Sequence, residues 1–514
     1  MRKKPIQEMP HPVIPGHSSS DLPCADFLSL SCYDPPAAQS VRMLTRVEPL
    51  EELGTWWLPA QQEDALGGSL FFSHGNQGIR LDLIGSFQPS ESGMGDRKLE
   101  SYPLIFGRLS SGSLVTLETC STIEVREVGL VNTTVTEGIQ AGHIYIGDHL
   151  PDGGGTICRL VELNFELLDI WARPDGHFAN QMQANPAAPG RFPFEYEIPA
   201  PVEFEAFGAR LSINYGMQLS GDENTHTVSR PIRILLGYQE GQSFRDIEET
   251  AIQPLHYLLT LACADELQVL GIRFVEMTAE SDRPLTSKWI EAGYLGWKEP
   301  SGSSRRWFEM LLPLHAIQDC IEDVAQKWSE LYEKADSSLH LFFALFLGPR
   351  LYLEARYLFA VQAAEVYHRR CFPNSVIDPD VHEERKRKVL AALKEDSELH
   401  QWMKGILHYT NEPPLRDRLT QLVDYGAPAT SELLRDNFVQ LAVRTRNRLT
   451  HYDPSLEGKA AADEDLYWLT EEVISLLECC FLRDLGFEPE GILERMGRTQ
   501  RARQLSRTRA ARSE

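Results

Sequence analysis

The sequence predicts an α+β multidomain protein, with an antiparallel β-rich N-terminal domain followed by an all-α helical bundle. From Gly54 to about Val228, short runs of β-branched and aromatic residues alternate with turn residues, which is typical of antiparallel strands. After Arg306, apolar residues recur at three- and four-residue spacing, which is typical of packed helices. At 514 residues, the chain is long enough for two folded units and additional tails.

Composition and charge narrow the class of protein. Hydrophobic residues make up 42% and charged residues 24%, as in soluble globular proteins. The formal charge of -24 repels nucleic acid and anionic membranes at long range, so any contact with RNA has to come from local basic segments. Nine scattered cysteines without a C-x-x-C pair predict reduced thiols in a cytoplasmic protein. No apolar run approaches the roughly 20 residues that span a bilayer, so no membrane partner is expected.

The N-terminal half is divided into an arm and a β-rich domain. Residues 1–45 are rich in Pro and Ser and predict a loose arm with at most a short helix. Residues 46–304 form the predicted β-rich domain, with a helix at Phe244–Ala262 that Ser243 caps. The glycine run 152–156 lacks the Lys-Ser/Thr of a phosphate-binding loop and predicts a hairpin turn. Pro, Gly and Ser cluster at Lys298–Ser304, the predicted linker.

Residues 305–490 form the predicted helical domain, and residues 491–514 a basic tail. The expected helices are Leu312–Lys334, Ser337–Leu347, Arg350–Cys371, His382–Glu395, Glu398–His408, Pro414–Val423, Ser431–Tyr452 and Asp463–Leu485. The tail contains many arginines and few apolar residues, so the sequence predicts that it is disordered.

The candidate chemistry lies at the end of a predicted helix, just before Pro454. Arg446, Asn447 and His451 occur together there. An Arg-x(4)-His spacing occurs by chance in roughly half of chains this long, and Asn447 makes the pattern roughly twentyfold rarer. Asn447 and His451 share a helical face, whereas Arg446 lies about 100° around the helix from Asn447. Either the helix end is distorted, or a second copy of the chain completes the site across a two-fold axis.

The segment Arg446-Asn-Arg-Leu-Thr-His451 resembles the signature of HEPN domains, in the form found in ApeA-like HEPN proteins of bacterial anti-phage defence. The preceding helix Tyr352–Arg370 is similar to the same subfamily. Residues 104–108 and 112–120 resemble the ApeA N-terminal domain. Together, the resemblance covers most of residues 50–490.

This resemblance implies an abortive-infection effector that cleaves RNA, with transfer RNA as the candidate substrate, and uses neither a metal nor a cofactor. His451 would transfer protons, Arg446 would hold the phosphate, and Asn447 would orient the histidine or donate to a phosphate oxygen. Glu365, an inward-facing acid, would pair with Arg446 or His451. The expected products are a 2′,3′-cyclic phosphate and a 5′-hydroxyl. The resemblance further implies a homodimer or higher even oligomer, controlled by the N-terminal domain, where a phage-derived trigger would bind.

Each residue also has an explanation that involves no catalysis. Glu365 can form an ion pair with Arg369 one helical turn away. Asn447 can be a polar residue late in a helix, and His451 can be a cation that favours the helix C-terminus. Arg444 and Arg448 are expected to contact RNA phosphates or solvent rather than to catalyse. The alternative function is therefore a non-catalytic helical scaffold that binds a nucleotide or a partner protein.

Overall fold

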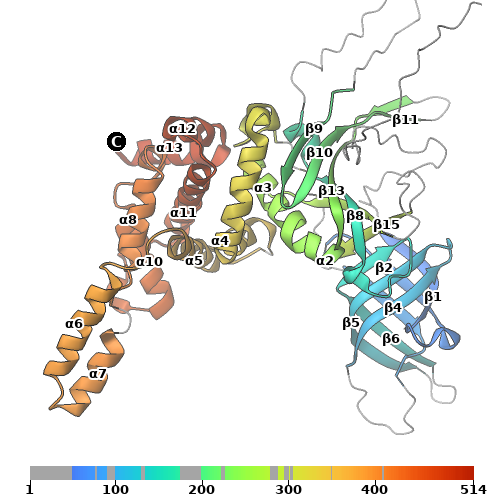
Figure 1. Cartoon of the computed structure of the whole chain (residues 1–514), viewed down its shortest axis with the longest axis horizontal. Helices are drawn as coiled ribbons and strands as arrows, with labels where there is room; N and C mark the ends of the chain where they lie inside the picture. Colours follow the sequence, from blue (N-terminus) through green and yellow to red (C-terminus); the bar gives the residue numbers. More distant parts are fainter. Residues whose placement is uncertain are drawn as a thin grey trace, which may run out of the picture.

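The computed structural model describes residues 49–513, except 76–77, 89–98, 129–133, 174–197, 222–225, 278–287, 295–299, 301, 303–304, 349 and 408–409. The β-rich half and the helical half lie side by side along the long axis of the molecule, as Figure 1 shows. This arrangement confirms the predicted fold class. The predicted arm at residues 1–45 and most of the predicted linker fall outside the described residues.

The first part of the β-rich half is a closed barrel. Its strands are β1 (Leu50–Trp57), β2 (Leu66–Phe72), β3 (Ile79–Ile84), β4 (Ser101–Leu109), β5 (Leu114–Val128) and β6 (Thr134–Ala141), with a short 3-10 turn η2 (Gln62–Asp64) between β1 and β2. The strand order is β4-β1-β2-β3-β6-β5, and β4 also pairs with β5, which closes the ring. Alternate side chains such as Trp56, Leu70 and Ile139 are fully buried inside it.

The sheet continues from β5 into an open antiparallel part, in the order β7-β15-β14-β8-β13-β10-β9. These strands are β7 (His143–Ile146), β8 (Ile157–Phe165), β9 (Val202–Ala206), β10 (Ala209–Tyr215), β13 (Ile232–Ser243), β14 (Val269–Glu276) and β15 (Trp289–Tyr294). A short helix, α1 (Leu168–Trp171), follows β8, and β11 (Gln218–Gly221) pairs with β12 (His226–Ser229) outside the main sheet.

Helices cover one face of the open sheet. They are α2 (Phe244–Ile247), a π-helical turn η4 (Glu248–Ile252) and α3 (Gln253–Cys263), and they form one continuous helical segment (Figure 1). The sequence predicted this segment. Its capping residue is also confirmed, because the Ser243 hydroxyl accepts a hydrogen bond of 3.1 Å from the backbone of Asp246.

The predicted hairpin at residues 152–156 is wrong. Gly153–Gly155 forms a 3-10 turn, η3, between β7 and β8, and these two strands pair with other strands rather than with each other. The physical reason is the buried carboxylate of Glu118, which accepts a hydrogen bond of 3.0 Å from the Gly154 amide and also binds Tyr145 and Arg245. The glycine run therefore satisfies a buried charge.

Between the two halves, residues 307–320 fold into short 3-10 turns, η6 (Trp307–Glu309), η7 (Leu314–Ala316) and η8 (Gln318–Cys320). The long helix α4 (Ile321–Leu347) follows, so the helix predicted from Leu312 begins later than expected. Leu312 is fully buried, and its carbonyl accepts a hydrogen bond from the indole of Trp171, so contacts with the β-rich half replace the first helical turns. The predicted division between helices 312–334 and 337–347 is present inside α4 as a kink, because the backbone of Ala335 is not helical (φ -132°, ψ 28°).

The helical half is built around two helices, α5 (Leu353–Cys371) and α11 (Asp463–Asp484). The other elements after α4 are α6 (Pro379–Ala392), α7 (Ser397–Leu407), α8 (Leu415–Tyr425), α9 (Ala429–Leu433), α10 (Phe438–His451), the 3-10 turn η9 (Pro454–Leu456), α12 (Pro489–Arg498) and α13 (Gln500–Ser513). Most of α11 is buried between the others, whereas α6 and α7 form a hairpin that extends away from the bundle (Figure 1). No helix within the described ranges is both long and apolar enough to cross a membrane.

The helix predicted at Ser431–Tyr452 is divided into α9 and α10. The chain leaves the helical conformation at Leu434, and the next residue, Arg435, binds both carboxylate oxygens of Glu472 at 2.8 and 2.9 Å. Arg435 also binds Asp465 at 2.8 Å. The break therefore places a mostly buried arginine against α11, which the local pattern of apolar residues could not indicate.

The predicted disordered tail at residues 491–514 is also wrong, because α12 and α13 occupy most of it. Arg501 enters the bundle and binds Glu471 at 2.8 Å and Glu478 on α11. Burial tends to raise the pKa of Glu471, but Arg501 and Arg356 outweigh it and hold the pKa below its usual value. Buried acids on a distant helix therefore order a segment that has few apolar side chains of its own.

Candidate active site

Helix α10 carries the predicted motif, and contacts with α5 and with the segment that follows the helix hold it in place. The Tyr357 hydroxyl on α5 donates a hydrogen bond of 2.6 Å to the carbonyl of Ala442. Thr445 is fully buried, and its hydroxyl accepts a hydrogen bond of 2.9 Å from the Ala461 amide, which fixes the segment after the helix. The helix ends at Tyr452 in the left-handed conformation, whose amide bonds to the Arg448 carbonyl.

Arg446 faces α5, where it meets Glu365. One nitrogen of its guanidinium lies 3.7 Å from a Glu365 carboxylate oxygen, and another donates to the Asn447 side-chain oxygen at 3.3 Å. Glu365 also binds Arg369, 3.2 Å away on the same helix. Of the pairings weighed for Glu365 from the sequence, those with Arg446 and Arg369 occur together, whereas no described contact joins Glu365 to His451.

His451 occupies a different position from Arg446. It is exposed in the last turn of α10, and no other described residue forms a hydrogen bond or ion pair with its ring. On a regular helix, His451 lies about 40° from Asn447 but about 140° from Arg446. Helix α10 has no irregular residue before its cap at Tyr452, so one chain does not bring Arg446 and His451 together by a distorted helix end.

Arg444 and Arg448 share the exposed side of α10 with His451. By the helical period, the three residues fall within about 60° of one another. Both arginines are partly exposed, and among the described residues neither side chain has an ion-pair partner. The end of α10 therefore presents three cationic or ionisable groups to solvent, within a protein whose total charge is strongly negative.

A network behind Glu365 could not be found from the sequence. Arg369 also binds Glu412 at 2.8 Å, and Glu412 lies 3.5 Å from the buried Arg418. Arg418 in turn lies 3.1 Å from the Nδ1 atom of His368, whose pKa is lowered by burial and by Arg418. His368 is therefore held neutral, and the charges extend from α10 through α5 to α8. These residues are up to about fifty positions apart, and no spacing signal joins them.

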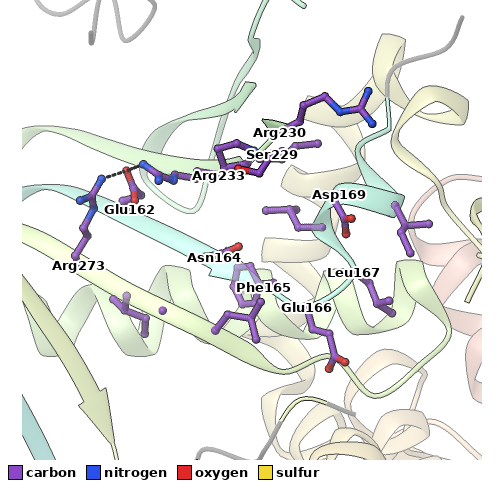
Figure 2. Close-up of a pocket in the computed structure, with 17 residues that line it drawn as sticks. Glu162, Asn164, Phe165, Glu166, Leu167, Asp169, Ser229, Arg230, Arg233 and Arg273 are labelled. Carbon is purple, nitrogen blue, oxygen red and sulfur yellow. Dashed lines mark hydrogen bonds and ion pairs between the residues drawn. The ribbon is translucent and has the colours of Figure 1, made fainter. Parts of the chain in front are cut away.

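The β-rich half contains a separate pocket of about 520 Å³ among β8, β13, β14 and α1. Figure 2 shows Glu162 at one end of it, between Arg273 and Arg233. Glu162 lies 2.7 Å from Arg273 and 3.4 Å from Arg233, and Arg273 also stacks on Trp289. One carboxylate therefore faces two guanidinium groups, and a net positive charge remains at this end of the pocket.

Comparison with known families agrees with the division of the chain. The family described as ApeA N-terminal domain 1 matches residues 51–328, more than half of the chain, and the family described as Apea-like HEPN matches residues 358–490. The chain belongs to the ApeA-like HEPN proteins. No curated protein and no solved structure matches it.

Membership connects the site to a class of activity. ApeA-like HEPN proteins act in anti-phage defence and carry a nuclease-type HEPN domain. In this ApeA-like HEPN protein, Glu365, Arg446, Asn447 and His451 all lie inside the matched HEPN segment. The sequence-based recognition of the family is thereby confirmed.

Proposed function

We propose that this protein is a cytoplasmic abortive-infection effector, a metal-independent endoribonuclease whose active site forms between two copies of the chain. The observation that supports the proposal is the position of the motif on α10. Arg446 is anchored to Glu365 on α5, while His451 is exposed at the helix end. Within one chain, Arg446 and His451 are thus separated. In a dimer, Arg446 of one chain could meet His451 of the other.

The chemistry of these residues fits cleavage by internal transfer. The ribose 2′-oxygen would attack phosphorus, the bond from phosphorus to the 5′-oxygen would break, and a 2′,3′-cyclic phosphate and a 5′-hydroxyl would form. His451 would take the proton of the 2′-hydroxyl or supply one to the leaving oxygen. The Arg446 guanidinium would hold the phosphate while negative charge develops, and Asn447 would orient a neighbour or donate to a phosphate oxygen.

Glu365 and the exposed arginines would act around this centre. Glu365 limits the freedom of Arg446 without neutralising it fully, because it also binds Arg369. Arg444 and Arg448 would hold the RNA backbone next to His451. Their positive charges would allow an acidic protein to bind RNA at this position. A structured RNA such as transfer RNA is the proposed substrate, and the N-terminal half is proposed to restrain the nuclease until a phage-derived trigger binds.

Cleavage in the presence of EDTA tests the activity. The purified protein is incubated with total transfer RNA, and the product ends are identified. We expect 2′,3′-cyclic phosphate ends with wild-type protein and none with His451→Ala or Arg446→Ala. His382→Ala, on the extended hairpin, serves as the control and should cleave normally. Equal cleavage by His451→Ala and wild type would exclude the proposed centre, and loss of wild-type cleavage in EDTA would exclude the metal-independent mechanism.

Mixing two inactive variants tests whether the site is shared. In a two-fold symmetric dimer with Arg446 and His451 from different chains, a mixed dimer of Arg446→Ala and His451→Ala contains one intact site. After unfolding and refolding an equal mixture, we expect about a quarter of the wild-type rate. If both groups of a site came from one chain, the mixture would stay inactive.

The same experiments address the non-catalytic alternative. A scaffold that binds a nucleotide or a partner would leave RNA intact in every preparation, including one lacking residues 1–304. Cleavage that appears only after this deletion would instead show restraint by the N-terminal half. Both outcomes are read from the same RNA substrate.

A further inference from the structure

A cavity of about 1010 Å³ lies between the open sheet and α4, away from the motif on α10. Arg159 of β8 and Tyr238 of β13 contribute to its sheet side, and the turn between β9 and β10 forms one wall. The opposite wall is α4. The cavity therefore lies between the β-rich half and α4. Figure 1 shows α4 between the β-rich half and the other helices.

Two residues that line this cavity have a buried hydrogen-bond donor without an acceptor among the described residues. Tyr238 is only 4% exposed, and no described residue is a hydrogen-bond partner of its hydroxyl. The Nε atom of Arg159 is also buried and has no hydrogen-bond partner among the described residues. No described acid forms an ion pair with the Arg159 guanidinium. A buried polar group without a partner destabilises a protein by about 1–3 kcal/mol and is rare. The sheet side of the cavity thus contains two unsatisfied donors that are covered in the free protein.

The regular pairing of β13 is also interrupted beside Tyr238. Along β13, pairing with β8 stops at Gly237 and resumes at Gln242. On its other edge, pairing with β10 ends at the same Gly237. Residues 238–241 are therefore not paired with β8 or β10 in the described strand registers. Residues 239 and 240 of this irregular stretch are exposed, and a strand segment outside the regular pairing is an element to which extended peptides can add.

The rim of the cavity carries negative charge. Glu330 and Glu333 are exposed on α4, one helical turn apart, and Glu205 and Glu240 line the sheet side. The second arginine of the lining, Arg210, is already paired with Glu203 at 2.7 Å. A nucleotide or RNA phosphate would meet this acidic rim unfavourably, whereas a lysine or arginine side chain would be attracted.

We propose that this cavity binds an extended peptide segment of a partner protein that carries a lysine or arginine. Carbonyl groups of the peptide accept hydrogen bonds from Tyr238 and Arg159, and its main chain pairs with residues 238–241. Its basic side chain binds Glu330 and Glu333. Because the Tyr238 hydroxyl is covered in the free protein, side chains on the walls shift when the peptide enters.

The inference goes beyond the proposed RNA cleavage and does not depend on it. Helix α4 packs against α3 on one side and against α5, the helix of Glu365, on the other. A peptide in this cavity would therefore contact both the sheet and the helix that the two halves of the molecule share.

Selection of peptides on the full-length protein tests the proposal. A phage-displayed library of random hexapeptides is panned against wild-type protein, and enriched peptides are titrated by fluorescence anisotropy. We expect enriched sequences to contain Lys or Arg, and their Kd to rise at least about tenfold in Tyr238→Phe and in the double variant Glu330→Gln, Glu333→Gln. Asp323→Asn removes a negative charge from α4 outside the cavity and should bind like wild type.

The thermal midpoint of free Tyr238→Phe protein gives a second measurement. Removing a hydroxyl that has no partner should leave the midpoint unchanged or raise it, while binding is lost. A lower midpoint would show that the hydroxyl is already satisfied inside the protein and would overturn its role. The proposal is also overturned if no peptide is enriched, or if the enriched peptides bind all variants equally.

Discussion

Replacing Arg501 by methionine should destabilise the helical half far more than its place near the end of the described chain would suggest. Its side chain is 16% exposed and binds two acids of α11, Glu471 and Glu478, which are 7% and 3% exposed. Glu471 keeps a second partner, Arg356, but Glu478 has no other described ion-pair partner and already has an unsatisfied oxygen. Removing one member of such a buried set costs about 3–5 kcal/mol.

The pH dependence identifies the cause. Burial raises the pKa of Glu478 even in the presence of Arg501, and without the arginine it should rise further. A carboxyl with a folded pKa above its unfolded value of about 4.3 destabilises the fold increasingly as pH rises through the folded pKa. The Arg501→Met variant should therefore recover part of its lost stability as the pH is lowered from neutral toward the unfolded pKa of the carboxyl group.

Urea denaturation followed by far-UV circular dichroism measures both effects. Arg507→Met is the matched control, because Arg507 is exposed on the same helix and should change the free energy of unfolding by no more than about 0.5 kcal/mol. Adding Glu478→Gln to Arg501→Met should restore part of the loss and remove most of its pH dependence. Equal midpoints for Arg501→Met and Arg507→Met would mean that α13 is not docked on α11, and the reasoning would fail.

Three further predictions concern other parts of the molecule. Glu365→Gln should lower the rate of RNA cleavage by about 10–100-fold with an unchanged circular dichroism spectrum, because Arg446 loses its anchor; a wild-type rate would contradict this role. Trp402→Ala should shift the unfolding free energy by less than about 0.5 kcal/mol, since Trp402 is 60% exposed; a larger loss in urea titration would show that the hairpin packs on something. Burial raises the pKa of Glu248 to about 7, so the wild-type thermal midpoint should fall as pH rises toward 7, and scanning fluorimetry should find a weaker fall in Glu248→Gln.

The parts of the fold that local patterns determine could be predicted from the sequence. The helix that follows Ser243 has a capping residue and a regular apolar stripe, and both are present in the structure. The strand character of β2 and β3 likewise followed from their β-branched and aromatic residues, and Leu70 pairs with Leu81 between the two strands. In each case the signal and the structure lie within a few residues of each other.

The errors arose where distant charges determine the backbone. Arg435 interrupts a periodic helix because Glu472, 37 residues later, binds it. Arg501 orders an arginine-rich segment because two acids on α11 lie inside the bundle. Neither partner could be identified without the tertiary structure, since a charged residue in a sequence gives no sign of whether it is buried.

The candidate site shows the same division. The positions of Arg446, Asn447 and His451 around one helix followed from the helical period, and α10 is regular. The contact between Arg446 and Glu365 was one of the pairings that the sequence allowed for Glu365. The structure contains it together with the ion pair between Glu365 and Arg369. The network of ion pairs continues from Glu365 through Arg369 to Glu412. It depends on how α5 and α8 pack against each other, and the spacing of residues along the sequence does not indicate this packing.

Helix α4 has a mechanical consequence for such a protein. The match to the N-terminal family ends at residue 328, inside the first of two helical segments of α4, which a kink at Ala335 separates. Each segment is stiff along its axis, and the kink at Ala335 is the position where the angle between the two segments can change. A displacement of the sheet would therefore reach α5 as a change of angle about Ala335, with no need for the halves to separate.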